Sequence, residues 1–189
     1  MAVLFFAEAF NGKVKKNGLE AASYAAKVAA AAGTQCIGLA VGTIEDSELS
    51  ALGAYGASKV IKVANAALNN FDSQAYAKVI AEVAKSTGSD IIIISQSLAG
   101  KSIAPRLSVK LDAGLVSGAV ELPNTSNGFV VKKGAFSGKA FAYVKIETAT
   151  KIVAVVPNAF GVIKGEGTAS VEAMDVNISD SDFGVKVLE

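Results

Sequence analysis

Short apolar runs alternate with longer amphipathic segments over the first 111 residues of the chain. The runs are typical of strands covered on both faces in a parallel sheet, and they span residues 3–7, 36–41, 59–63 and 91–94. Between them, apolar residues recur at helical spacing over residues 19–32, 73–87 and 99–111, and a shorter helix is expected to end near Gly56. This alternation predicts an α/β fold with a parallel sheet covered by helices on both faces.

Polar residues mark the predicted beginnings of the helices. Thr43 with Asp46 three residues later resembles a capping box ahead of the short helix. Asp72 or Ser73 can cap the helix that ends at Thr87, because both side chains accept hydrogen bonds from unpaired N–H groups of a first turn.

The helical period stops after Asp112. Strands are expected over residues 114–122, 129–133, 139–147 and 152–156, separated by turns of hairpin length. We therefore predict that these strands pair antiparallel and extend the parallel sheet in the C-terminal half of the chain. Residues 1–163 would form a single α/β domain, and residues 164–189 a polar, extended arm in which 175–180 form a strand that packs on a neighbour.

The charge balance limits the partners of the chain. Lys and Arg total 18 against 17 Asp and Glu, and 51% of the residues are apolar. A net charge of +1 leaves no excess positive field to hold nucleic acid or anionic lipid. No apolar run reaches the roughly 18 residues of a membrane span, and no basic segment precedes the first apolar run, so we expect a cytoplasmic protein.

Residue counts also limit the chemistry. The chain has no histidine and one cysteine, Cys36, which lies within an apolar run and is expected to be part of the core. Imidazole is therefore absent as a general base or metal ligand. We expect no catalytic constellation and no metal site.

One loop resembles a phosphate-binding motif without completing it. Residues 95–102 follow a strand and open a helix, but Ser95 stands where the first glycine of a P-loop would be. Ser97, Gly100 and Lys101 are therefore only weak candidates for cofactor binding. The favoured interpretation is that Ser97 caps the helix, Gly100 permits close packing, and Lys101 is solvated or pairs across an interface.

Two small charge clusters have structural interpretations. Glu45, Asp46 and Glu48 fall in the first turn of a predicted helix, where carboxylates favour the positive end of the helix dipole. The basic residues Lys13, Lys15 and Lys16 are expected to lie in a hairpin or solvated turn. The run is too small to hold nucleic acid.

Several stretches, in order and with spacing kept from residue 2 to about 185, resemble the N-terminal domain of the electron transfer flavoprotein alpha subunit. They are VLFFAE from Val3, LGAYGASKV from Leu52, GKSIAPRLSVKL from Gly100, AGLVSG from Ala113, FSGKA from Phe136 and VVPNAF from Val155. The ordered set is more specific than any single stretch.

The resemblance implies a subunit that pairs with a beta subunit and carries electrons from flavin dehydrogenases, as in fatty acid oxidation, to a membrane quinone reductase or another acceptor. In that family the FAD is held mainly by a second alpha-subunit domain, whose flavin signature has no counterpart in this chain. No flavin-contacting residue can therefore be assigned, and we expect FAD to be bound outside the chain. The leading hypothesis is a scaffold domain that holds the beta subunit and the FAD-binding domain through an exposed apolar patch near the antiparallel strands.

Two other classes of function remain open. One is a stand-alone adenine-nucleotide-binding module resembling the universal stress family, although the G-x-x-G spacing followed nine residues later by G-[ST] does not occur. The other is an enzyme that uses carboxylates or lysines in the loop from Ser95 to Lys101, since the carboxyl ends of parallel strands commonly bind ligands.

Overall fold

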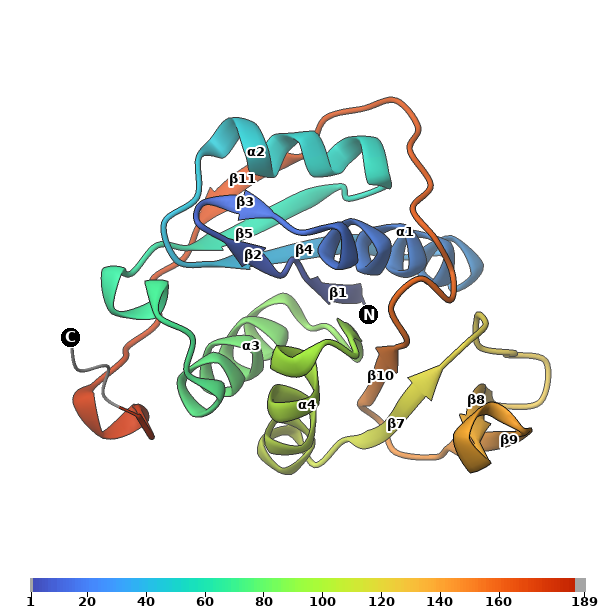
Figure 1. The fold of residues 1–189 in the computed structure, drawn as a ribbon. Helices are drawn as coiled ribbons and strands as arrows, with labels where there is room; N and C mark the ends of the chain where they lie inside the picture. Colours follow the sequence, from blue (N-terminus) through green and yellow to red (C-terminus); the bar gives the residue numbers. More distant parts are fainter. Residues whose placement is uncertain (1, 186–189) are drawn as a thin grey trace.

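A nine-stranded sheet runs through the molecule, with helices packed above and below it (Figure 1). The structure is a computed structural model and describes residues 2–185. The strands follow the order β11-β5-β4-β1-β6-β10-β7-β8-β9. Their bounds are β1 (Ala2–Phe6), β4 (Gln35–Val41), β5 (Lys59–Val63), β6 (Ile91–Ser95), β7 (Gly114–Ala119), β8 (Phe129–Ala135), β9 (Ala140–Ile146), β10 (Lys151–Val155) and β11 (Ser170–Ala173).

The helices divide between the two faces, so the predicted fold class is confirmed. On one face lie α1 (Lys16–Ala31), α2 (Asp46–Ser50) and the 3₁₀ turn η1 (Ala51–Tyr55). On the other lie α3 (Ser73–Thr87) and α4 (Leu98–Leu111). Three short 3₁₀ segments, η2 (Ala66–Asn69), η3 (Phe136–Gly138) and η4 (Asp180–Asp182), complete the helical elements.

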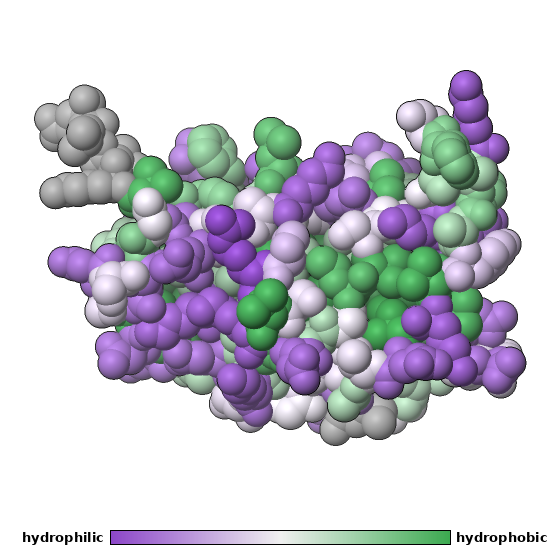
Figure 2. Space-filling model, turned by 90° about the horizontal axis from the view of Figure 1, so that it is seen from below, coloured by the Kyte–Doolittle hydropathy of each residue, from purple (hydrophilic) through white to green (hydrophobic). Residues whose placement is uncertain are grey.

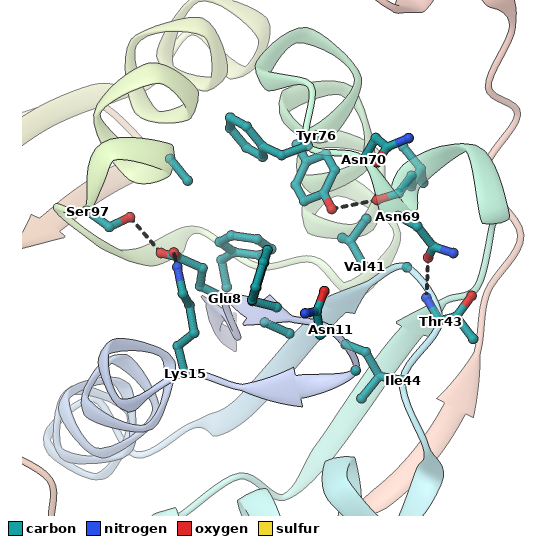
Figure 3. A pocket seen from close by; sticks show the side chains of 18 of the residues that line it. Glu8, Asn11, Lys15, Val41, Thr43, Ile44, Asn69, Asn70, Tyr76 and Ser97 are labelled. Carbon is teal, nitrogen blue, oxygen red and sulfur yellow. Dashed lines mark hydrogen bonds and ion pairs between the residues drawn. The ribbon is translucent and has the colours of Figure 1, made fainter. Parts of the chain in front are cut away.

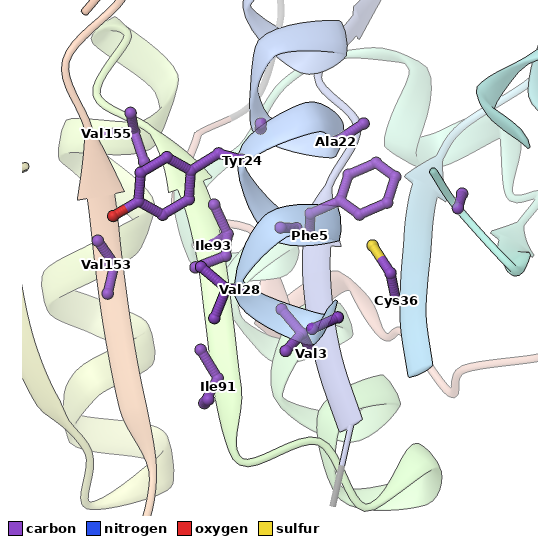
Figure 4. Close-up of a cluster of buried hydrophobic side chains, with 14 of the residues drawn as sticks. Val3, Phe5, Ala22, Tyr24, Val28, Cys36, Ile91, Ile93, Val153 and Val155 are labelled. Atoms are coloured by element: carbon purple, nitrogen blue, oxygen red, sulfur yellow. The ribbon is translucent and has the colours of Figure 1, made fainter. Parts of the chain in front are cut away.

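Each face of the sheet has its own hydrophobic core. Alternate residues of β1 explain this, because Val3 and Phe5 pack under α1 (Figure 4). Leu4, between them, belongs to the core on the side of α3 and α4. Cys36 is buried in the α1 core as predicted, and burial raises the pKa of its thiol to about 12. The thiol is therefore a packing group rather than a nucleophile.

The predicted pairing of the C-terminal strands is partly wrong. The strands β8 and β9 form an antiparallel hairpin, and β8 meets β7 antiparallel at one pair, Ala119 with Lys133. However, β10 lies parallel between β6 and β7. Burial explains its position, because Ile152 belongs to one core and Val153 to the other, as in a central strand.

The capping box predicted at Thr43 is also wrong. The N-cap of α2 is Glu45, and the Thr43 N–H donates to Asn69 Oδ1 at 2.8 Å instead. By contrast, Asp72 caps α3 as predicted, with Oδ1 accepting from the N–H groups of Gln74 and Ala75 at 2.8 and 3.0 Å.

The C-terminal segment returns to the sheet. Its strand is β11, which pairs parallel with β5 in the same sheet, whereas residues 175–180 contain no strand and the prediction of one there is wrong. The N-cap of α3 and one side chain of the helix then hold the segment, because Asp72 Oδ2 accepts from the Gly184 N–H at 2.9 Å and Lys78 pairs with Asp182 at 2.9 Å. The division between a domain at 1–163 and an arm at 164–189 stays a prediction, and residues 186–189 of that arm lie outside the described residues.

Candidate functional site

The strands β1 and β6 lie side by side at the point where the connections of the sheet change direction. The chain leaving β1 leads to α1 on one face, and the chain leaving β6 leads to α4 on the other. In open α/β sheets this divergence leaves a crevice at the carboxyl ends of the strands. A cavity of about 780 Å³ occupies this position, and we call it the switch-point cavity (Figure 3).

Apolar side chains from several elements form the floor of the switch-point cavity. The buried ones are Phe6, Val41, Ile44, Leu68 and Tyr76. The Tyr76 ring packs edge-on against Phe6 and Phe71, with centroid distances of 5.9 and 5.1 Å. Burial, with a smaller contribution from Glu8, raises the pKa of Tyr76 to about 12, so its hydroxyl stays protonated and donates to the Leu68 carbonyl at 2.6 Å.

Glu8 is the central polar group of the switch-point cavity. It lies two residues beyond the end of β1, and its side chain is buried, with only 6% of the residue exposed. Its Oε1 accepts from Lys15 Nζ at 2.8 Å, and its Oε2 accepts from Asn17 Nδ2 at 2.8 Å and Ser97 Oγ at 2.6 Å. The carboxylate therefore joins the end of β1 to the beginnings of α1 and α4.

The basic run begins in a hairpin, as predicted, but it ends in a helix, because Lys15 is the N-cap of α1 and Lys16 its first residue. The strands β2 (Ala9–Phe10) and β3 (Lys13–Val14) pair antiparallel, and Asn11 and Gly12 turn between them with φ of 49° and 74°. The lysines have local partners, since Lys13 pairs with Glu48 at 3.0 Å and Lys15 with Glu8.

Two of the acidic residues around α2, Glu48 and Asp46, are likewise engaged in ion pairs. Burial works against ionisation of Glu48, but hydrogen bonds from Lys13 and the Val14 N–H outweigh it and hold the pKa below its ordinary value. Asp46 pairs with Lys62 at 2.7 Å. Within residues 2–185, no group of three or more potential ligands is placed to hold a metal ion.

The three loop candidates from the sequence have different environments. Ser97 lines the switch-point cavity and caps α4, accepting from the Gly100 N–H at 3.0 Å. Gly100 is needed for packing, because a Cβ there would lie 1.8 Å from the Ser95 carbonyl oxygen. Lys101 is exposed on α4 and is not among the residues that line the cavity.

Most of the lining residues were not identified from the sequence. The polar ones that sequence reasoning missed are Glu8, Asn11, Asn17, Thr43, Asn69, Asn70 and Tyr76. The sequence does contain a signal that could have identified Glu8 as a site residue. Glu8 comes directly after the first apolar run and is followed by an Asn-Gly turn. The segment around Asn69 carries no comparable signal in the sequence. Its residues line the cavity because of the way in which η2 and α3 pack in the folded chain.

A second candidate site is a surface on the antiparallel hairpin. Its side chains Phe136, Phe141 and Tyr143 are 83, 57 and 70% exposed, and we call these three residues the hairpin surface. Lys132 Nζ lies 4.3 Å from the centre of the Phe141 ring and also pairs with Glu121. The strand β9 is the last in the sheet, so its outer edge is open. The predicted exposed apolar patch near the antiparallel strands is confirmed.

Hydrophobic side chains also gather on the neighbouring underside of the molecule. Figure 2 shows them on the right of that face, the side on which Figure 1 places β7, β8 and β9. Clusters of this kind mark sites of protein association.

Comparison with known proteins identifies relatives over almost the whole chain. Residues 3–179 match the family described as the electron transfer flavoprotein domain. The electron transfer flavoprotein subunit alpha of Thermoanaerobacterium thermosaccharolyticum is 28% identical over 190 residues, covering 98% of this chain and 58% of the relative. The corresponding subunit of Bacillus subtilis is 30% identical over 149 residues, covering 77% of this chain and 46% of the relative.

A third relative has a different name. The acryloyl-CoA reductase electron transfer subunit beta of Anaerotignum propionicum is 30% identical over 125 residues, covering 66% of this chain and 34% of the relative. The chain thus spans about half the length of the curated relatives it matches. None of the helices between residues 2 and 185 combines the length and apolar character needed to cross a bilayer.

Proposed function

This chain belongs to the electron transfer flavoprotein domain family, and from that premise we propose that it is the scaffold and partner-binding domain of an alpha subunit. In this role it holds a beta subunit and seats the FAD-binding domain of its own subunit. The complete protein then carries electrons from flavin dehydrogenases, including those of fatty acid oxidation, to a respiratory acceptor such as a membrane quinone reductase. We place this activity in the cytoplasm.

The hairpin surface is the observation that carries the proposal. Aromatic side chains are enriched at the centres of protein interfaces and contribute most of their binding free energy. Here, Phe136, Phe141 and Tyr143 are exposed together beside an open sheet edge. Partner binding needs such apolar area and shape rather than acid–base groups, so we propose a carrier subunit and not an enzyme.

The switch-point cavity matches FAD poorly. The pyrophosphate of a dinucleotide is usually held by a glycine-rich loop and a helix N-terminus. Of the described residues lining the cavity, only Glu8 and Lys15 are charged, and their ion pair at 2.8 Å leaves no net positive charge for a pyrophosphate. We therefore assign FAD to the part of the complete protein outside this chain and derive no electron-transfer step from these residues.

The proposal is tested by co-purification with a beta subunit of the same family. The unchanged chain is expected to elute with the beta subunit as one complex in size-exclusion chromatography. Combined Phe141→Ala and Tyr143→Ala substitutions should weaken the complex at least tenfold, because hot-spot residues of interfaces, among which aromatic side chains are enriched, contribute about 2 kcal/mol or more.

A matched control is available on α4. Val109 is an apolar residue that is 84% exposed, more than Phe141 or Tyr143, and it lies outside the hairpin surface. The Val109→Ala variant should bind the beta subunit like the unchanged chain. Failure of the unchanged chain to form any complex would contradict the partner-binding role.

A further inference from the structure

Asparagine is followed by glycine at three places in the chain, and the fold treats the three pairs differently. We propose that Asn11-Gly12 and Asn127-Gly128 are sites of spontaneous deamidation, which converts the asparagine to aspartate or isoaspartate, and that the fold protects Asn17-Gly18. This inference concerns the covalent chemistry of two exposed turns and does not depend on the partner-binding role.

Deamidation needs no catalyst, cofactor, oxidant or reductant. The backbone nitrogen of the residue after asparagine attacks Cγ of the side chain, its proton passes to the side-chain nitrogen, and the Cγ–N bond breaks to release ammonia. Water then adds to either carbonyl carbon of the five-membered imide and opens it to aspartate or to isoaspartate. Glycine favours the attack because it has no Cβ to hinder the approach of its nitrogen.

Asn11 is exposed at the turn between β2 and β3, where it adopts a φ of 49°. Among the residues that the structure describes, neither its side chain nor the Gly12 N–H has a hydrogen-bond partner, and Figure 3 marks no interaction of Asn11. The two strands pair at only two positions. A two-stranded hairpin of this size is marginally stable, so the turn can open and let the glycine nitrogen reach the side chain.

Asn127 lies in the loop that joins β7 to β8. Residues 124–128 of this loop are all exposed, and Gly128 adopts a φ of 91°. No described residue holds the Asn127 side chain by a hydrogen bond, and the nearest strand-like pairing is the isolated one between Asn124 and Val130. Both the side chain and the backbone at this pair are therefore free to reach the geometry of the attack.

Asn17 has the same neighbour in the sequence but lies in the first turn of α1. Its Nδ2 donates to Glu8 Oε2 at 2.8 Å, and the Gly18 N–H donates to the Lys15 carbonyl at 2.9 Å. A Cβ added at Gly18 would lie 2.9 Å from the Glu8 carbonyl oxygen, so the backbone has no room to shift toward the imide. Reaction at Asn17 must wait until the first turn of α1 opens.

Conversion of Asn11 would change the charge of the switch-point cavity, which this residue lines. The charged lining residues of the described chain are Glu8 and Lys15, which neutralise each other. A carboxylate at position 11 therefore leaves the cavity with a net negative charge. Isoaspartate also adds one atom to the main chain of a two-residue turn, which disturbs the pairing of Phe10 with Lys13.

The test is incubation of the full 189-residue chain at pH 8 and 37 °C, with peptide mapping by liquid chromatography and mass spectrometry over time. In the folded chain, Asn11 and Asn127 should each convert at least about tenfold faster than Asn17, because only Asn17 requires a helix to open. In concentrated urea the three rates should agree within about threefold, because each asparagine precedes glycine and the fold no longer separates them.

Two variants serve as controls. Asn127→Gln should abolish the reaction at position 127, because the longer side chain cannot form the five-membered ring, and should leave the rate at Asn11 unchanged. Asn11→Asp supplies the reference peptide for one product, so a second peak of equal mass is isoaspartate. The proposal is overturned if Asn17 converts as fast as either exposed asparagine in the folded chain, if neither exposed asparagine converts there, or if Asn17 stays tenfold slower in urea.

Discussion

Glu20 on α1 accepts the Gly161 N–H at 2.8 Å, which joins the first helix to the loop that follows β10. The same carboxylate accepts the N–H groups of Asn158 and Phe160 at 2.7 and 2.9 Å. Glu20 is 3% exposed, so these backbone donors replace the water that would otherwise solvate its charge. The loop in turn supplies Phe160, whose ring packs edge-on against Tyr24 of α1.

Replacing Glu20 with alanine should lower the free energy of unfolding by about 2–4 kcal/mol, because it leaves buried N–H groups of the loop without an acceptor. Urea denaturation followed by circular dichroism measures the loss. Glu166→Ala is the control, since Glu166 is exposed, and it should change the free energy by less than about 0.5 kcal/mol. An equal effect of the two substitutions would show that the loop is not held by Glu20.

Replacing Gly100 with alanine should destabilise the protein severely. The added Cβ would lie 1.8 Å from the Ser95 carbonyl oxygen, and backbone must move to relieve the contact. We expect a loss of about 3 kcal/mol or more in denaturant titrations, or a large loss of soluble protein. Gly134→Ala is the matched control, because no atom lies within 4 Å of a Cβ added there. Equal stability of both variants would argue against close packing of α4 on β6.

Stability should fall in acid partly through Asp72. Burial alone would raise the pKa of this carboxyl, but N–H groups of Ala75, Gln74, Gly184 and Val185 outweigh burial and hold the pKa below its ordinary value. A lowered folded-state pKa gives stability that is present above the unfolded value of 3.8 and is lost as the pH falls through the folded value.

The measurement is urea unfolding at pH 7, 4 and 3 for the unchanged chain and Asp72→Asn. Asparagine keeps the helix cap but cannot accept from both chain segments, so we expect a loss of about 1–2 kcal/mol at pH 7 and a smaller difference at pH 3. A difference that does not change with pH would rule out the ionised carboxylate as its source.

Ser97 has two hydrogen bonds that alanine would remove. Its hydroxyl donates to Glu8 Oε2 at 2.6 Å and accepts the Gly100 N–H at 3.0 Å. Ser97→Ala should therefore lower the free energy of unfolding by about 1–3 kcal/mol in chemical denaturation. Ser170→Ala, on the exposed side of β11, is the control and should have little effect. A neutral Ser97→Ala would mean that neither bond stabilises the folded chain.

The parallel half of the fold was predictable because each strand has a local signature. The run from Ile91 to Ile94 is apolar enough to fill both cores, and α3 begins after Asp72 and ends at Thr87 as expected. The position of β10 was not predictable from connection length. A short link from β9 indicated a hairpin, but the burial of Val153 and Ile152 on opposite faces favours a central parallel position.

The candidate site was less accessible to sequence reasoning. Glu8 and Ser97 are 89 residues apart, and their contact exists only because β1 and β6 are adjacent. The sequence could identify Ser97 as a helix cap, which is a local property. It could not show that the same hydroxyl meets a buried carboxylate, which depends on strand order.

The strands β11 and β9 form the two borders of the sheet. The last described residues pack on α3. Phe141 is exposed on β9, at the opposite border of the sheet from β11. Figure 1 shows the C-terminal segment and the β8–β9 hairpin on opposite sides of the molecule. Under the proposed function, a protein docked on the hairpin would leave the segment that packs on α3 uncovered. The opposite borders of the sheet would then leave room for two binding partners at once.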